Sequence, residues 1–334
     1  MPGFEDVWRP PVQRRPRRPE TVLRPRTLGA VRARLQRIAR RAPEVMVKVT
    51  GRTRDPAHLA AHLTYITRNG DLPAEGRDGI VAEGRQEMIE LAQDWSAAAV
   101  MDSRRRANSP FSVAIILSMP AGTGAIRLRD AARAFAAAEF EHGFDYVLVL
   151  HTDQAHPHVH LTVRALGELG VRLNPKKADL DRWRQTFAEA LRDRGVDAEA
   201  TPRRTRGVTR KPERGALRRI RERHARGQGG MGRVASEKLK AAAQLAFGGP
   251  PKPTPWEEQM ARRQQAVRRL YLAQAKLLQA SGDADDRRLA IEIEGFVRGM
   301  PAPDSERLAI ARQLRDANAR VVVARKSGAR ERDR

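Results

Sequence analysis

The sequence contains no cysteine, and only 4% of its residues are aromatic. The lack of cysteine excludes disulfides, cysteine-ligated zinc and cysteine nucleophiles, and it fits a reducing cytoplasm. Long apolar runs are also missing: the longest, around residues 113–117, is far too short to span a bilayer, and the basic N-terminus lacks the apolar stretch of a signal peptide. We therefore expect a cytoplasmic protein without membrane insertion.

Acidic residues are scarce relative to basic ones. The 334 residues include 64 Lys and Arg against 40 Asp and Glu, which leaves a formal net charge of +24. Residues 1–54 carry +11, residues 201–234 carry +10 and residues 235–334 carry +7, whereas residues 55–200 carry −4. Arginine-rich segments of this density bind phosphate backbones through counterion release, although solvated tails that bind nothing are the alternative. The charge predicts nucleic-acid contact by the flanks of a normally composed domain.

Composition and periodicity divide the chain into four segments. Residues 1–43 are predicted to be a basic, largely disordered arm with one short helix around 28–41, and residues 44–200 a folded domain. Residues 201–234 form an Arg-rich linker, and residues 235–334 a helical region with charged amphipathic helices over 256–280 and 287–318.

Within the folded domain, alternating or β-branched runs predict strands and apolar stripes predict helices. The expected strands are 45–49, 111–118, 144–151, 156–165 and 171–174, and the expected helices are 56–70, 85–105, 127–142 and 179–194. This order predicts an α+β fold, with an antiparallel-rich central sheet flanked by helices, followed by a C-terminal helical module.

Four of the eight histidines fall within ten residues, in the run HTDQAHPHVH. On a strand, His158 and His160 share one face, and His151 ends the preceding strand, so that three imidazoles approach one point. Three neutral nitrogen ligands leave coordination positions open for water or a phosphate oxygen. Asp153 is then either an acceptor that orients a ligand imidazole or a general base. The alternative is a group of surface histidines, or an adventitious metal site.

Tyr65 is predicted to lie on the polar face of its helix. The core stripe consists of Leu59, Leu63 and Ile66, and the other face carries His58, His62, Tyr65 and Asn69. A helix-end tyrosine with one hydrogen bond is the commonplace interpretation. A phenolate, however, attacks phosphorus when a base or a metal lowers the cost of its deprotonation. We interpret His58 and His62 as DNA-contacting or internally satisfied surface residues.

Three ordered motifs resemble those of a known family. LTYITRNG is similar to the motif with the nucleophilic tyrosine, FSVAIILSMPAGT to the second motif with its DNA-contacting serine, and HTDQAHPHVHL to the metal motif. The chain thus resembles the conjugative relaxases, the histidine-hydrophobic-histidine nicking endonucleases of mobilisable plasmids, which include the border endonuclease of Ti plasmids. The resemblance covers roughly residues 45–210. The arm before it resembles an extension, or the product of a start codon placed too early.

The resemblance implies roles for individual residues. Tyr65 would attack a phosphodiester, and His151, His158 and His160 would bind a divalent ion, Mg²⁺ or Mn²⁺. Ser118 would help to hold the strand near the nick, and Asp153 matches the acidic position of the metal motif. Arg164 stands near the place of an asparagine that is common in the family. The expected DNA contacts are Arg68, Arg164, Arg203, Arg204 and Arg206.

The resemblance also implies a reaction and partners. The reaction is strand-specific nicking at an origin of transfer by tyrosine transesterification, on single-stranded or melted DNA. The implied partners are accessory relaxosome proteins and the coupling protein of a type IV secretion system, with passage of the DNA-linked protein into a recipient cell. Two alternatives remain open from the residues themselves: a metal-dependent nuclease or phosphodiesterase that activates water, and a non-catalytic origin-binding accessory protein.

Overall fold

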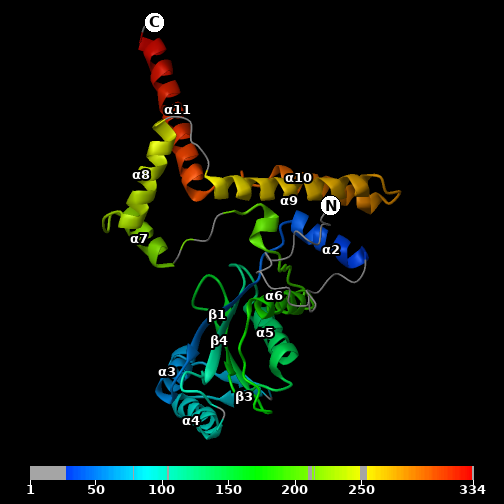
Figure 1. The fold of residues 1–334 in the computed structure, drawn as a ribbon, viewed down its shortest axis with the longest axis vertical. Helices are drawn as coiled ribbons and strands as arrows, with labels where there is room; N and C mark the ends of the chain where they lie inside the picture. Colours follow the sequence, from blue (N-terminus) through cyan, green and yellow to red (C-terminus); the bar gives the residue numbers. More distant parts are fainter. Residues whose placement is uncertain are drawn as a thin grey trace. The chain divides into compact units, whose positions relative to one another are not determined.

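The computed structural model describes residues 28–77, 79–103, 105–209, 213, 215–248 and 254–332. The chain divides into two compact units, and the boundary in the sequence lies between Thr201 and Pro202. We call residues 28–201 the sheet unit and residues 202–332 the helical unit (Figure 1). Of the arm predicted over residues 1–43, residues 1–27 lie outside the described part of the chain.

The sheet unit is built on one six-stranded sheet in which every pair of neighbouring strands is antiparallel. The strand order is β1-β4-β6-β5-β2-β3. The strands are β1 (Met46–Thr53), β2 (Ala74–Gly76), β3 (Gly79–Ala82), β4 (Ser112–Ser118), β5 (Tyr146–His151) and β6 (His158–Arg164). Together with the helices on its two faces, this sheet confirms the predicted α+β fold (Figure 1).

One face of the sheet packs against α5 (Ala125–Phe140) and α6 (Lys177–Arg192). The inward residues of β4 and β6 alternate with outward ones, and they bury Val113, Ile115 and Leu161 in this core. Phe135 and Trp183 meet edge to face at 6.4 Å between α5 and α6. This core fixes β6, and with it the faces to which the histidines of β6 point.

The opposite face is covered over only part of its width. Helices α3 (Pro56–Ile66) and α4 (Arg85–Met101) pack Leu59, Leu63 and Trp95 against Val147 and Val149 of β5. On β1, at the far edge, Met46 is 47% exposed, and Lys48 is exposed on the same face. Around Met46 and Lys48, beside the half-buried Ile116 of β4, this face is therefore open to solvent, and we call this part the open half. The other β4 side chains on the same face are buried: Ser112, Ala114 and Ser118.

Helix α2 (Leu28–Ala39) forms where a short helix was predicted, and it belongs to the sheet unit. Leu35 and Ile38 are buried, and Arg37 Nε donates to the buried carboxylate of Glu199 at 2.9 Å. Residues before the predicted domain start thus contribute to the packing of this unit.

Two predictions for the sheet are wrong in detail. Residues 171–174 form no strand: Leu166 and Arg172 make one isolated bridge, and Pro175, which has no N–H, precedes the turn into α6. The short strands β2 and β3 were not predicted, because residues 74–82 carry glycine and charge instead of an apolar alternation. Strand β2 is held at the sheet edge by pairing with β5 and by an ion pair of Glu75 with Arg133 of α5 at 2.5 Å, and β3 pairs with β2.

The helical unit contains a short 3₁₀ helix, η1 (Arg203–Arg206), and the helices α7 (Gly215–Ala225), α8 (Arg233–Phe247), α9 (Pro255–Gln279), α10 (Ala284–Arg298) and α11 (Glu306–Arg332). The single helix predicted over 287–318 is wrong, because Pro301 and Pro303 interrupt it between α10 and α11. Helix α7 lies within the segment predicted to be a linker. Among the described residues, no helix combines the length and the apolar character needed to cross a bilayer.

Candidate active site

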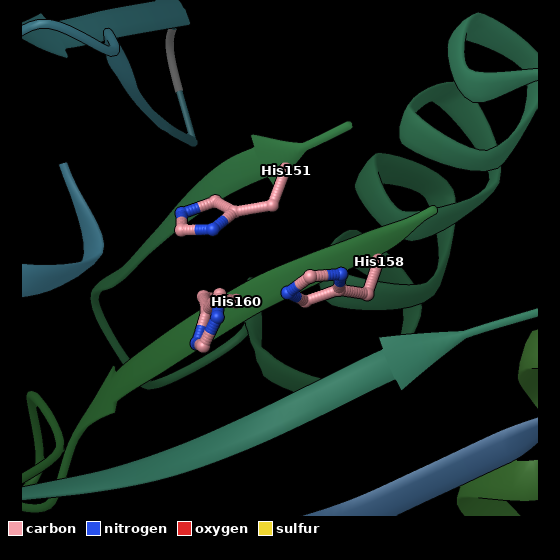
Figure 2. A group of neighbouring side chains, drawn as sticks. All are labelled: His151, His158 and His160. Atoms are coloured by element: carbon pink, nitrogen blue, oxygen red, sulfur yellow. The ribbon is translucent and has the colours of Figure 1, made fainter. Parts of the chain in front are cut away.

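Three imidazoles meet on the partly open face of the sheet. In the strand register, His158 of β6 lies opposite His151 of β5, and His160 follows two residues later on the same face. The ring centroids are 4.5 Å apart for His151 and His160 and 5.1 Å apart for the other two pairs. Figure 2 shows the three rings converging from the two strands. Alternation along β6 places His158 and His160 on one face, and the antiparallel pairing of β5 with β6 adds His151 beside them.

The hydrogen bonds of the histidines leave lone pairs free for a metal. His158 Nδ1 lies 3.2 Å from the carbonyl oxygen of His156, and His151 Nε2 lies 2.5 Å from the carbonyl oxygen of Ile66. Since a carbonyl oxygen only accepts, each of these nitrogens carries the proton, and the other ring nitrogen keeps its lone pair.

The environment also favours the neutral form of two of these imidazoles, His151 and His160. Burial lowers the pKa of His160 to about 4, and the charges of the neighbouring histidines add to the effect. Burial lowers the pKa of His151 as well, against the opposing hydrogen bond to the Ile66 carbonyl. Neutral imidazoles are the form that binds metal ions.

The three side chains fit a divalent ion. One nitrogen atom from each lies within 4.8 Å of the other two. Nitrogen ligands about 2.1 Å from a shared ion lie roughly 3–4 Å apart, so that small side-chain rotations close the site. With only three protein ligands, the site keeps positions for water or a phosphate oxygen.

Asp153 links this cluster to the helix that carries Tyr65. Its Oδ2 pairs with Arg68 Nη2 at 2.5 Å, and its Oδ1 lies 3.9 Å from His151 Nδ1. Desolvation acts to raise the pKa of Asp153, but a backbone hydrogen bond and Arg68 outweigh it, so that the pKa lies below its ordinary value. The carboxylate is therefore charged at neutral pH, and it lies between the Arg68 guanidinium and the His151 imidazole.

Tyr65 lies one residue before Ile66, whose carbonyl contacts His151. Helix α3 begins at Pro56, and the side chain of Asp55 caps it by accepting from the His58 amide at 2.7 Å. The Tyr65 side chain is 74% exposed, on the polar face that the helical spacing predicts. It lines an open cavity of about 690 Å³ between α3 and α4. Its ring is thus accessible to a large substrate.

The two histidines of α3, His58 and His62, have different environments. His62 is half-buried, and its Nε2 lies 2.9 Å from Thr162 Oγ1 of β6. Burial and the nearby His58 lower the pKa of His62. His58 is exposed. Of the two, His62 is thus the one satisfied by a hydrogen bond within the domain.

Ser118 and Arg164 lie at opposite ends of the histidine strand. Ser118 of β4 pairs with His158, is 5% exposed, and donates its hydroxyl to the Pro157 carbonyl at 3.1 Å. Arg164 ends β6, and its Nη1 donates to Asp145 Oδ2 at 2.7 Å. The structure therefore brings Ser118 to the metal motif and leaves Arg164 a strand length away.

The arginines predicted after the folded domain belong to the helical unit. They lie on η1: Arg203 is exposed, whereas Arg204 and Arg206 are half-buried.

Lys48 is a candidate site residue that the sequence patterns did not identify. It lies on the open half of the histidine face, where it pairs with Ile116 of β4, and Ile116 in turn pairs with His160 of β6. Its two-residue spacing from the exposed Met46 was the signal that could have identified it.

Residues 65–196 match the family model described as "Relaxase: MobA/VirD2-like, nuclease domain". Within the sheet unit, this segment is similar to a relaxase nuclease domain. The matched segment begins at Tyr65 and includes Ser118, Asp153 and all three clustered histidines. The resemblance to the relaxases that the sequence motifs predicted is confirmed.

Similarity to curated proteins points the same way. The chain is similar to the "T-DNA border endonuclease VirD2" of Rhizobium radiobacter, at 28% identity over 187 residues, or 51% of this chain and 44% of that protein. It is 26% identical to the protein of the same description from Agrobacterium fabrum, over 51% of this chain and 42% of that protein. The alignments therefore span less than half of each relative.

A solved structure titled "Molecular Basis of Vancomycin Resistance Transfer in Staphylococcus aureus" aligns at 14% identity with a TM-score of 0.34. The alignment covers 48% of this chain and 98% of the chain in the solved structure. The TM-score is too low to establish a common fold.

Proposed function

We propose that this relaxase nicks one DNA strand at an origin of transfer by metal-assisted tyrosine transesterification, and that the nick initiates conjugative transfer. The observation that carries the proposal is the three-histidine cluster, one member of which, His151, is hydrogen-bonded to the main chain of the helix that carries Tyr65. A metal-binding group and an accessible phenol on one rigid frame are the two components that such a reaction needs.

The reaction forms one bond and breaks one. Tyr65 Oη attacks the scissile phosphorus, the bond from phosphorus to the 3′ oxygen breaks, the phenolic proton leaves, and the 3′ oxygen takes up a proton. No water is consumed, so that the 5′-phosphotyrosyl link conserves the bond energy and a 3′-hydroxyl can reverse the step. A divalent ion held by His151, His158 and His160 would offset charge on the phosphate oxygens. Asp153 holds Arg68 beside the cluster, and the Ile66 carbonyl accepts from His151 Nε2 and thereby orients this ligand.

The DNA strand is proposed to lie across the open half of the histidine face. Met46, Lys48 and Ile116 line this surface next to His158 and His160, and nothing lies within 4 Å of a side chain added at Gly51. A flat, partly apolar surface with one ammonium group suits a single strand, because bases stack on apolar atoms and phosphates bind cations. Arg203, Arg204 and Arg206 of the helical unit would also contact DNA phosphates.

The partners follow from this reaction. Single-stranded or locally melted DNA at the origin is the substrate, and accessory relaxosome proteins and the coupling protein of a type IV secretion system are its proposed partners. The proposed ion is Mg²⁺ or Mn²⁺, and the proposed location is the cytoplasm, with transfer of the DNA-linked protein to a recipient cell.

The test uses a labelled oligonucleotide that contains the host plasmid's origin region, incubated with the full chain and Mn²⁺ or Mg²⁺. Denaturing electrophoresis and mass spectrometry are expected to find a covalent DNA adduct on Tyr65. Tyr65→Phe should abolish both nicking and adduct while metal binding is retained, and Tyr271→Phe, in the helical unit, is the matched control. Cleavage by the Phe variant would instead support a water-activating nuclease, and no cleavage by any form would support a non-catalytic origin-binding protein.

A further inference from the structure

The turn that follows the Tyr65 helix has an unusual backbone. Arg68 and Asn69 have φ angles of 54° and 61°, in the left-handed region that side chains other than glycine rarely adopt. Gly70 follows with a φ of 97°, and a Cβ added there would lie 2.3 Å from the backbone nitrogen of Arg85 in α4. The turn is thus fixed against the start of α4, and strained residues in such a turn point to a role for what they present.

This turn makes two polar contacts with the metal motif. The Ile66 carbonyl accepts from His151 Nε2 at 2.5 Å, and the Arg68 guanidinium pairs with Asp153 at 2.5 Å. The second carboxylate oxygen of Asp153 faces His151 Nδ1 at 3.9 Å. Ile66 and Arg68, which closely follow Tyr65 in the sequence, therefore both contact the segment from His151 to Asp153.

The surroundings of Arg68 distinguish a positioning role from a DNA contact. Its guanidinium is paired with a carboxylate, so that its charge is already compensated before DNA binds. The two side chains are 42% and 40% exposed, and ion pairs of such exposure contribute little to stability. What the pair does determine is where the end of the Tyr65 helix lies relative to His151.

From this geometry we propose that Arg68 is a positioning residue: through its ion pair with Asp153, it holds the end of the Tyr65 helix in register with the histidine cluster. The inference rests on the proposed function and deepens it. Misplacing a reacting group by about 1 Å costs on the order of a hundredfold in rate, so that loss of this link should slow the chemical step and leave DNA affinity nearly unchanged.

The experiment measures single-turnover nicking by the full chain at saturating oligonucleotide, and oligonucleotide affinity without metal. Arg68→Ala should lower the rate at saturation at least about tenfold and change the affinity less than about threefold, and Arg68→Lys should restore part of the rate. The matched control is Arg77→Ala, which removes an ion pair with Glu168 at 3.0 Å near the opposite end of β5 and should keep the wild-type rate. Circular dichroism verifies that each variant is folded.

A double-mutant cycle with Asp153→Asn tests the pathway. The combined variant should be no slower than Asp153→Asn alone, because both changes break the same link. Full rate at saturation with weakened oligonucleotide affinity in Arg68→Ala would identify a phosphate contact and overturn the inference, as would additive rate losses in the cycle. A wild-type chain that forms no Tyr65 adduct would overturn the proposed function and this inference with it, whereas wild-type adduct formation by Arg68→Ala would overturn the inference alone.

Discussion

Single residues in the metal motif differ in what they contribute, and His156 and His158 make this testable. His156 is exposed, and its Nδ1 accepts from the Ala121 amide at 3.0 Å, whereas His158 lies in the cluster. His158→Ala is expected to weaken Mn²⁺ binding by more than the roughly 10–100-fold that loss of an outer-shell group costs. His156→Ala should leave the affinity within a few-fold of wild type. Titration calorimetry checks both, and equal losses would contradict the assignment.

Ser118 offers a second test at the same scale. Its buried hydroxyl donates to the Pro157 carbonyl, immediately before His158. Ser118→Ala should lower the free energy of unfolding by about 1 kcal/mol, because the buried Pro157 carbonyl keeps only the longer hydrogen bond from the Met119 amide at 3.4 Å, and should weaken metal binding with it. Denaturant unfolding and calorimetry measure the two effects. If instead metal-free oligonucleotide binding weakens while stability is unchanged, Ser118 contacts DNA directly.

Side-chain spacing made part of this site predictable. The two-residue interval between His158 and His160 fixes a common face, and the helical interval from Leu59 to Ile66 leaves Tyr65 on the other side of its helix. The contact of His151 with the Ile66 carbonyl joins residues 85 positions apart through a main-chain atom. No side-chain pattern encodes such a contact, so that the link between the Tyr65 helix and the histidine cluster emerges only from the fold.

At the scale of elements, strand β1 presents different residues on its two faces. Lys48 lies on the histidine face, whereas Arg52, beyond the irregularity between Val49 and Gly51, pairs with Val113 and lies on the other. If DNA lies across the histidine face, Lys48→Ala should reduce the slope of log affinity against log salt by about 0.7–1, and Arg52→Ala should change it little. Fluorescence anisotropy over a salt series distinguishes the two faces, and equal slopes for both variants would contradict the proposed path.

Helices and strands with strong apolar periodicity could be predicted from the sequence, whereas short strands whose formation depends on a pairing partner could not. The apolar stripe of α6 and the β-branched run of β4 identified those elements from local sequence. Strand β2 forms because it pairs with β5 and because its Glu75 makes an ion pair with Arg133, and β3 pairs in turn with β2. Neither the β5 partner nor Arg133 can be inferred from residues 74–82. Conversely, residues 171–174 have strand-like composition but turn into α6 after one bridge. Tertiary context overrides propensity in short segments.

At the scale of the whole molecule, charge and chemistry occupy different parts of the chain. The residues with the candidate site, 55–200, carry a net charge of −4, while residues 201–234 and 235–334 carry +10 and +7. The charge that would attract a polyanion over long range thus lies outside the segment that contains the histidines. A helical unit rich in like charges, however, needs specific interactions to stay folded, since self-repulsion opposes its compact form.

Glu257 provides such an interaction, and its titration gives a prediction for the entire helical unit. This buried carboxylate accepts from Arg307 Nε at 2.7 Å, Ser305 Oγ at 2.5 Å and the Thr254 amide at 2.8 Å, and so joins the start of α9 to α11. The Arg307 hydrogen bond, against the opposing desolvation, holds the pKa of Glu257 well below its ordinary value. The stabilisation is therefore complete above the unfolded-state pKa of about 4.3 and is lost as the pH falls from there toward the folded-state pKa.

Glu257→Gln removes this titration. At neutral pH it should lower the free energy of unfolding by about 2 kcal/mol, because Arg307 loses a charged partner. The difference between wild type and variant should shrink as the pH falls below about 4, since protonation removes the same charge from the wild type. Denaturant unfolding followed by far-ultraviolet circular dichroism measures this difference at each pH. Asp285→Asn, at an exposed position in α10, is the control, and a difference that grows on acidification would mean that Glu257 is not the group that titrates.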